Sequence, residues 1–485
     1  MEEKQAHLPT KRDRFLDRYM SDSLEIHCTR IRLTQSSAQL PTIYEAPGTL
    51  RLGKSFGMDC ELHVPQRGAT FRDALALISS SKRPPAGQLL APDQYYRLEA
   101  VDEDGAVWTH PALTLSIRVF PEAYAVRFGA EFVENVAQIE GEAYACRLTY
   151  VEDLNLPTNL YVDERRPDGS YFSGRHGSEG RLANLDLVYR LLYMKNGSHR
   201  GEIEVRAVDD RLPQHADIRL IETLQFCSAM SASPICIEVA NGYRRSIRIE
   251  KHKPAHQGLV LPPLQGRSAD KDFYRLATAF YEHACRTSDY EGLSPIFSKV
   301  RSIFELSDAS VEPIALILCV AVEGLAQFGE LRALTLASDE HREVVEGALF
   351  AVLEMPQFAA LAQRFESAKT GADRRTLEER VRAVFSMLSQ GGRTKDILRL
   401  LEAADAVTAE EIRAWDNLRH PSAHGSWEFL EEKFQVDLDK MYRILTLVYR
   451  MVFFHIGYQG QFANRSMFNW PSGSFDPKAL VGDQE

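Results

Sequence analysis

One stretch near the C-terminus combines side chains that can act on a phosphate, Trp415-Asp-Asn-Leu-Arg-His-Pro-Ser-Ala-His-Gly425. Within it, Arg419 and His424 are separated by four residues. Pro421 disfavours helical geometry at the residue before it, so we expect the chain to bend between the two. A guanidinium can hold a phosphate, and an imidazole can move a proton near neutral pH. The stretch therefore predicts a site that holds a phosphate and transfers a proton.

The surroundings of this pair distinguish it from a second arginine and histidine at the same spacing. Arg450 and His455 enclose only apolar residues, so we interpret His455 as a core histidine on the apolar face of a helix. The first pair follows the capping box Thr408-Ala-Glu-Glu411, which predicts a helix from Thr408 to about Arg419 or His420. A polar residue, a helix break, small residues and a glycine then follow the arginine.

Three polar neighbours in the stretch can support the pair. His420 either helps to orient the phosphate or caps the C-terminus of the helix. Asn417 and Ser422 are close enough in sequence to bind substrate, although hydrogen bonds to the local backbone are the simpler role for both. The same simple alternative applies to Arg419 and His424, as a helix-end arginine and a loop histidine that make structural hydrogen bonds.

A carboxylate in a distant apolar run is a further candidate. Glu323 is the only charged residue between Glu312 and Glu330. An unpaired buried carboxylate is costly, so it should have a cationic partner. It either orients Arg419 or His424, or it pairs with a structural arginine elsewhere among the helices.

The composition is that of an ordinary globular protein, with 485 residues, 44% hydrophobic and 26% charged, enough for about two to four domains. No stretch has the apolar length of a membrane span, and the N-terminus lacks the apolar core of a signal peptide. We therefore expect a cytoplasmic protein without membrane contact. The seven cysteines include no C-x-x-C pair, which argues against a zinc site. We expect no metal and no other cofactor.

The hydrophobic periodicity changes midway along the chain and predicts an α+β multidomain protein. A β-rich N-terminal half, sandwich-like or barrel-like, precedes an all-α helical bundle. We expect a flexible arm at 1–21, a β-rich domain at 22–152, a second β-rich subdomain at 153–253, a linker at 254–269, the helical domain at 270–458 and a C-terminal tail at 459–485. Helices are predicted at 213–230, 272–287, 312–328, 339–354, 356–368, 374–390, 395–404 and 436–456, besides the capped one and a short one at 70–79.

The motif and its helical setting resemble the HEPN ribonuclease superfamily, in which an arginine, a polar residue, a short spacer and a histidine follow one another. Leu418-Arg-His-Pro-Ser-Ala-His-Gly425 particularly resembles the Apea-like branch. Ala321-Val-Glu-Gly-Leu325 resembles the pattern that those domains carry on an early helix. His420 fills a position that is often Asn or Asp in the family. The resemblance covers residues 270–458, and β-rich regions precede such domains in bacterial anti-phage proteins.

The resemblance implies a metal-independent endoribonuclease of anti-phage defence, or a toxin, with Arg419 and His424 as catalytic residues. It implies a homodimer in which two motif copies face each other across a groove. The substrate would be RNA, with tRNA among the candidates. The N-terminal half would either sense a trigger, for example one derived from a phage, or restrain the nuclease.

The chemistry of the two side chains agrees with this expectation. RNA carries a 2′-hydroxyl that DNA lacks, a histidine can exchange its proton, and an arginine can stabilise the charge that grows on the phosphate. The net charge of −11 weighs against broad nucleic-acid binding but leaves room for one local cluster. The alternative is a non-catalytic helical dimerisation, RNA-binding or protein-binding module.

Overall fold

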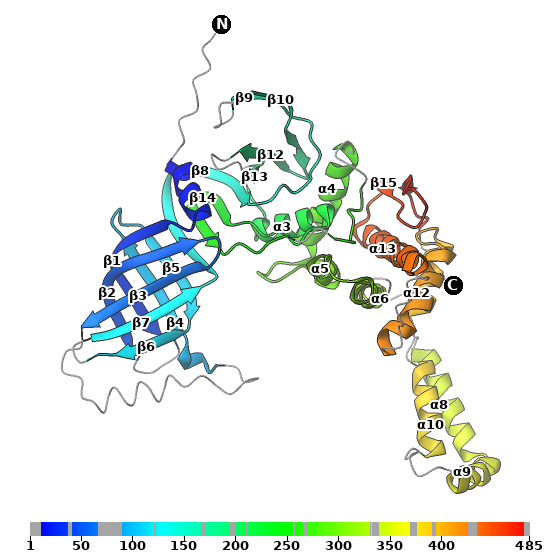
Figure 1. Ribbon diagram of the computed structural model, residues 1–485. Helices are drawn as coiled ribbons and strands as arrows, with labels where there is room; N and C mark the ends of the chain where they lie inside the picture. The colour runs from blue at the N-terminus through cyan, green and yellow to red at the C-terminus, as the bar shows by residue number, and fades with distance from the viewer. Residues whose placement is uncertain are drawn as a thin grey trace. The chain divides into compact units, whose positions relative to one another are not determined.

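Figure 1 shows the computed structural model of the chain. It describes residues 11–36, 41–65, 90–120, 123–165, 171–193, 199–209, 211–255, 258–264, 270–329, 331, 339–368, 376–389, 394–424 and 434–479. The contacts divide the chain into two compact units. Unit 1 holds residues 1–256 and 266–294, and unit 2 holds residues 257–265 and 295–485. The expected α+β class, with strands in the first half and mostly helices in the second, is confirmed.

Unit 1 is built on one curled antiparallel sheet of twelve strands (Figure 1). Eleven follow the order β11-β12-β13-β8-β5-β4-β1-β2-β3-β7-β6, and β14 pairs with β8 outside that path. Their bounds are β1 Leu24–Gln35, β2 Ile43–Gly53, β3 Gly57–Pro65, β4 Tyr96–Asp102, β5 Val107–Leu113, β6 Leu115–Val119, β7 Ala123–Ala130, β8 Phe132–Tyr150, β11 Gly177–Leu182, β12 Leu185–Tyr193, β13 His199–Ala207 and β14 Cys236–Glu250. A separate two-stranded sheet joins β9 Tyr161–Arg165 to β10 Tyr171–Arg175.

Alternating sequence explains the core of this sheet. In β1, Leu24, Ile26 and Cys28 are buried, and the residues between them are exposed. Successive side chains of a strand point to opposite faces, so this alternation places one apolar row inside the curl. The inner row packs with those of β2, β3 and β4 into a common apolar core.

The expected boundary between two β-rich parts at residue 152 is wrong, because one sheet crosses it. β8 belongs to the first expected part, and β13 and β14 belong to the second. β8 nevertheless pairs with β13 from Ala145 to Tyr150 and with β14 along nearly its whole length. Pairing between strands distant in sequence is specified by burial of the final sheet and not by local composition.

Both ends of unit 1 also differ from expectation. The expected flexible arm includes the helix α1 Lys11–Met20, which buries Leu16 and Tyr19. The Tyr19 hydroxyl donates a hydrogen bond to the backbone oxygen of Glu250. Residues 1–10, and the short helix expected at 70–79, lie outside the described residues.

The first helix expected in the helical domain belongs to unit 1 instead. α4 Asp270–Thr287 packs on α3 Ala216–Ser228 and on β11. Phe226 and Phe280 stack with ring centroids 4.6 Å apart, and Ser178 and Tyr274 share a hydrogen bond of 2.7 Å. The expected start of the helical domain at residue 270 is therefore wrong, because α4 belongs to unit 1 by its contacts. The predicted helix itself is confirmed.

Unit 2 is mostly helical. Its helices are α5 Phe297–Glu305, α6 Val311–Ala326, α8 Asp339–Glu354, α9 Pro356–Ala368, α10 Leu377–Ser389, α11 Thr394–Ala403, α12 Ala409–His424 and α13 Phe434–Ile456. α6 packs against α5, α11, α12 and α13, whereas α8, α9 and α10 pack on one another. All but α5 were predicted from the sequence. Across the described ranges, no single helix is long and apolar enough to span a membrane; only α8 and α9 together, bent by 72°, would pass on length and composition.

The described residues 258–264 of the expected linker and 459–479 of the expected tail are packed parts of unit 2. Val260 and Leu264 of the linker are buried, and the backbone of Leu261 accepts a hydrogen bond of 2.6 Å from the Tyr449 hydroxyl. The tail forms a hairpin of β15 Gly460–Ala463 and β16 Ser472–Phe475. Its Phe462 and Phe475 lie against Phe453 of α13. Aromatic residues scattered in a polar tail therefore mark a packed segment.

Candidate active site

The start of α12 is fixed by the predicted capping box. The Thr408 amide donates to Glu411 Oε2 at 3.0 Å, and the Glu411 amide donates to Thr408 Oγ1 at 3.3 Å. Glu411 is buried, and it also accepts hydrogen bonds from Arg450 Nη1 at 3.3 Å. The Arg450 guanidinium lies over the ring of Phe462, with Cζ 5.4 Å from the centroid. Arg450, the arginine of the second Arg–His pair in the sequence, therefore has a structural role.

The end of α12 differs from expectation. The helix runs through Pro421 to His424, without the bend expected at His420. Proline within a helix removes one hydrogen bond and costs about 3 kcal/mol. Packing of α12 on α6 and α13 offsets that cost, because Trp415 and Leu418 are buried in the preceding turns. On a regular helix, positions 419 and 424 are about 140° apart around the axis.

Three of the predicted side chains cannot be placed. The side chains of His420, Ser422 and His424 lie outside the described residues, as do residues 425–433. Asn417 can be placed: it is exposed, and it is two positions before Arg419 on the same helix. Residues two apart on a helix do not face each other, so Asn417 does not converge with Arg419.

Arg419 is placed by two contacts. Its Nε lies 2.5 Å from Glu323 Oε1 of α6, so Glu323 pairs with Arg419, one of the partners considered from the sequence. Its Cζ lies 5.3 Å from the ring centroid of Trp415, one turn earlier on α12. The arginine and glutamate side chains are 41% and 37% exposed. Among the residues that the structure describes, Glu323 is the only ion-pair partner of this guanidinium, so its terminal nitrogens can reach an added anion.

Cys319 lies one turn before Glu323 on α6 and was not predicted as a neighbour of the pair. Burial, with a smaller contribution from the Glu323 carboxylate, raises the pKa of its thiol to about 12, and Arg419 opposes the shift. At neutral pH the sulfur is therefore protonated. A thiol is a weak nucleophile, so the arrangement does not favour thiolate chemistry at this site.

We expect Cys319→Ala to leave any activity of the Arg419 site within about twofold of the wild type, because the protonated thiol takes no part in the chemistry. In the native protein, iodoacetamide should fail to label Cys319 until denaturant is added, as followed by mass spectrometry of the peptide. Rapid native labelling of Cys319 would contradict the burial and the raised pKa.

Lys299 of α5 is the second unpredicted neighbour. A Cβ atom at Gly324 would lie 3.2 Å from Lys299 Cδ, so the lysine stem crosses α6 at the residue after Glu323. No sequence pattern marks this contact, because it joins two helices. Cys319, by contrast, could have been found from its four-residue spacing to Glu323 on a predicted helix.

The apolar interpretation of His455 agrees with its contacts. Its Nε2 lies 3.0 Å from the backbone oxygen of Leu325, at the end of α6, and its ring meets that of Phe328 edge-on at 5.3 Å. The imidazole is half-buried and serves to join α13 to α6.

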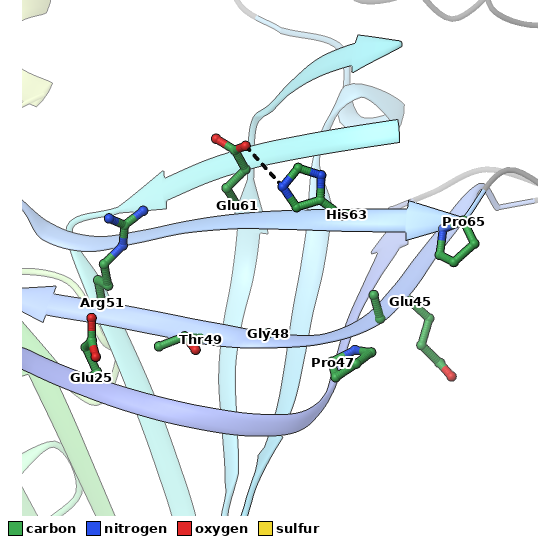
Figure 2. Close-up of a pocket in the computed structure, with 10 residues that line it drawn as sticks. Glu25, Glu45, Pro47, Gly48, Thr49, Arg51, Glu61, His63 and Pro65 are labelled. Carbon is green, nitrogen blue, oxygen red and sulfur yellow. Dashed lines mark ion pairs between the residues drawn. The ribbon is translucent and has the colours of Figure 1, made fainter. Parts of the chain in front are cut away.

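Unit 1 offers a separate open cleft of about 680 Å³ on the outer surface of its sheet (Figure 2). β2 and β3 pair only from Arg51 to Gly53 and from Gly57 to Asp59. Beyond that point their outward side chains line the cleft, together with Glu25 of β1. Figure 2 shows the ion pair of Glu61 and His63, 3.5 Å apart, on the β3 side. None of the residues predicted for chemistry lines this cleft.

Comparison with known proteins found no matching family model, curated protein or solved structure. The HEPN resemblance therefore remains an expectation, carried by Arg419, His424 and the Ala321–Leu325 pattern. Any functional conclusion has to come from the chemistry of the residues around Arg419.

Proposed function

We propose that this protein is a metal-independent endoribonuclease of the HEPN type, working as a homodimer with a composite site. The observation that carries the proposal is the partly exposed guanidinium of Arg419, oriented by Glu323 and Trp415 on the helix that also carries His424. A cation that is held in place but still open to solvent is suited to binding a phosphate.

In the proposed reaction, the 2′-oxygen of a ribose attacks the adjacent phosphorus and the bond to the 5′-oxygen breaks. One histidine takes the proton of the 2′-hydroxyl, and a second histidine protonates the leaving 5′-oxygen. Arg419 stabilises the negative charge on the phosphate oxygens during the transfer. Because each chain supplies one His424, a second copy of the chain provides the second histidine. The products are a 2′,3′-cyclic phosphate and a 5′-hydroxyl.

The direct test is cleavage of purified tRNA and mixed cellular RNA in excess EDTA. The proposal expects cleavage, products with 2′,3′-cyclic phosphate ends, and no cleavage of DNA or of RNA that is 2′-O-methylated throughout. His424→Ala should abolish both the cleavage and the growth arrest on overexpression. A preparation that forms dimers and binds RNA, yet never cuts it, would reject the enzyme.

Glu323→Gln is expected to lower the RNA cleavage rate about tenfold, because the neutral amide holds Arg419 less firmly than a carboxylate does. The rate constant under single-turnover conditions measures the effect. Glu305→Gln on α5, which removes the exposed pair with Arg301, is the matched control and should leave the rate unchanged. Equal rates for all three proteins would show that Glu323 does not position the arginine.

A non-catalytic helical dimerisation, RNA-binding or protein-binding module is the second candidate. It is favoured by the outer face of α6, where Leu316 and Val320 are exposed within an apolar run of the sequence. Exposed apolar side chains beside each other mark contact surfaces. The nuclease and the non-catalytic module differ in the fate of bound RNA, which only the nuclease cuts. The cleavage test therefore decides between them.

For the N-terminal half we propose a sensing or restraining role in bacterial defence or toxicity. The cleft between β2 and β3 is a candidate position for a phage-derived trigger, since it is open and lined by charged and apolar groups together. Charge reversal of Glu61 should then change the trigger requirement for growth arrest without changing the RNA cleavage of an already active protein.

A further inference from the structure

Lys299 lies across α6 at Gly324, the residue after Glu323, which pairs with Arg419. The missing side chain of Gly324 makes room for its stem: a Cβ there would lie 3.2 Å from Lys299 Cδ and 3.8 Å from Cγ. Gly324 directly follows Glu323, which holds Arg419. The aliphatic part of the lysine is thus fixed on the backbone of α6, and long basic side chains commonly keep the charged end in water when the stem is packed.

The charge of Lys299 is not neutralised within the described part of the chain. The residue is exposed and has no ion-pair partner there. Its nearest acid along α6, Glu323, pairs with Arg419 instead. Its neighbour on α5, Arg301, pairs with Glu305 at 2.7 Å. Lys299 and Arg419 contact adjacent positions of α6, Gly324 and Glu323, and two cations anchored in this way favour an anion with more than one negative group.

We propose that Lys299 binds a second phosphate of the RNA strand, adjacent to the phosphate held by Arg419. This inference rests on the proposed function and names a contact that binds substrate without taking part in bond breaking. An ammonium is a compact charge with rotatable donors, so it suits a flanking phosphate that needs no fixed bidentate geometry. Lys299 would therefore set affinity and register, and Arg419 would act on the reacting phosphate.

The experiment measures binding of a fluorescein-labelled 2′-O-methyl oligouridine, which cannot be cleaved, across a range of salt concentrations. Lys299→Ala should weaken binding about fivefold to tenfold and reduce the magnitude of the slope of log affinity against log salt by about one. Lys299→Arg should keep most of the affinity. Arg301→Ala, on the same helix but already paired, should behave as wild type.

Gly324→Ala gives an independent arm, because its methyl group would displace the lysine stem. It should weaken binding less than Lys299→Ala does, and adding it to Lys299→Ala should cause no further loss. Thermal unfolding of each variant identifies a loss that comes from misfolding. Equal affinities and slopes for Lys299→Ala, Arg301→Ala and wild type would overturn the proposal.

The arms also separate this inference from the nuclease. Loss of binding in Lys299→Ala together with no cleavage of natural RNA by the wild type would keep the phosphate contact and reject the enzyme. Cleavage that depends on Arg419 but not on Lys299 would keep the enzyme and reject the contact.

Discussion

Replacing Arg419 with alanine is expected to lower the rate constant of metal-free RNA cleavage about 10²-fold to 10³-fold, with little change in stability. Loss of one group that stabilises developing negative charge typically has this size. The fold should survive because the side chain is 41% exposed and its ion pair with Glu323 is partly exposed as well. Ion pairs of that kind contribute about 0–1 kcal/mol to the free energy of unfolding.

Two controls make the result specific. Arg419→Lys keeps the charge but loses the planar fork and the stacking on Trp415, so an intermediate rate is expected. Arg413→Ala on the same helix removes an exposed arginine beside Glu410 and should leave the rate unchanged. A lowered rate constant with unchanged substrate affinity indicates a contact made in the transition state. Equal rates for Arg419→Ala and Arg413→Ala would place the chemistry elsewhere.

Local sequence patterns predicted much of the secondary structure for a physical reason. Alternation in β1 and the capping box of α12 each depend on residues within one strand or one helical turn. The periodicity of α6, α11, α12 and α13 reflects the face that each one buries, and seven of the eight helices that the structure describes in unit 2 were predicted. Only α5 was not, and it is nine residues long, which leaves little room for a repeat.

Long-range organisation was harder to predict from the sequence, because it depends on contacts between segments that are distant in sequence. The pairing of β8 with β14 joins the two expected β-rich parts, and the Phe226–Phe280 stack draws α4 to unit 1. A composition shift at residues 254–269 indicated a linker, yet Val260 and Leu264 are buried. Prolines and glycines mark irregular backbone, and irregular backbone can still be packed.

The candidate site shows the same limit on a smaller scale. The sequence identified Glu323 as a carboxylate that needs a cation but could not choose between Arg419, His424 and a structural arginine. The contact with Arg419 depends on how α6 and α12 pack. The intrinsic preference of proline predicted a helix break at Pro421. The helix continues to His424, because tertiary packing overrides that preference.

Arg219→Met is expected to lower the free energy of unfolding of unit 1 by about 3–5 kcal/mol, the typical cost of leaving one charge of a buried pair alone. Arg219 and Glu222 of α3 are 0% and 1% exposed. Arg219 Nη1 donates to both carboxylate oxygens at 2.8 and 2.9 Å, and Nη2 donates to the backbone oxygens of Tyr290 and Gly292. The pair therefore fixes the segment after α4 to α3.

Urea unfolding followed by circular dichroism measures this loss. Arg382→Ala breaks the exposed pair with Glu378 on α10 and should change stability by less than about 0.5 kcal/mol. The double variant Arg219→Met, Glu222→Leu should recover part of the loss, because no unpaired charge remains buried. A single variant as stable as the Arg382→Ala control would show that the buried pair does not hold unit 1 together.

The stability loss of Arg219→Met should also depend on pH, in a direction set by the pKa of Glu222. Burial raises the pKa of Glu222 above its ordinary value of 4.5, even with Arg219 and Ser294 opposing the shift. A carboxyl with a raised folded-state pKa contributes stability below its unfolded pKa and loses that contribution as pH rises through the folded value. Without Arg219 the folded-state pKa of Glu222 rises further. The loss of stability with rising pH then becomes larger and extends to higher pH. The stability deficit of Arg219→Met should therefore be larger at about pH 8 than at about pH 5. A deficit independent of pH would mean that removing Arg219 leaves the folded-state pKa of Glu222 unchanged.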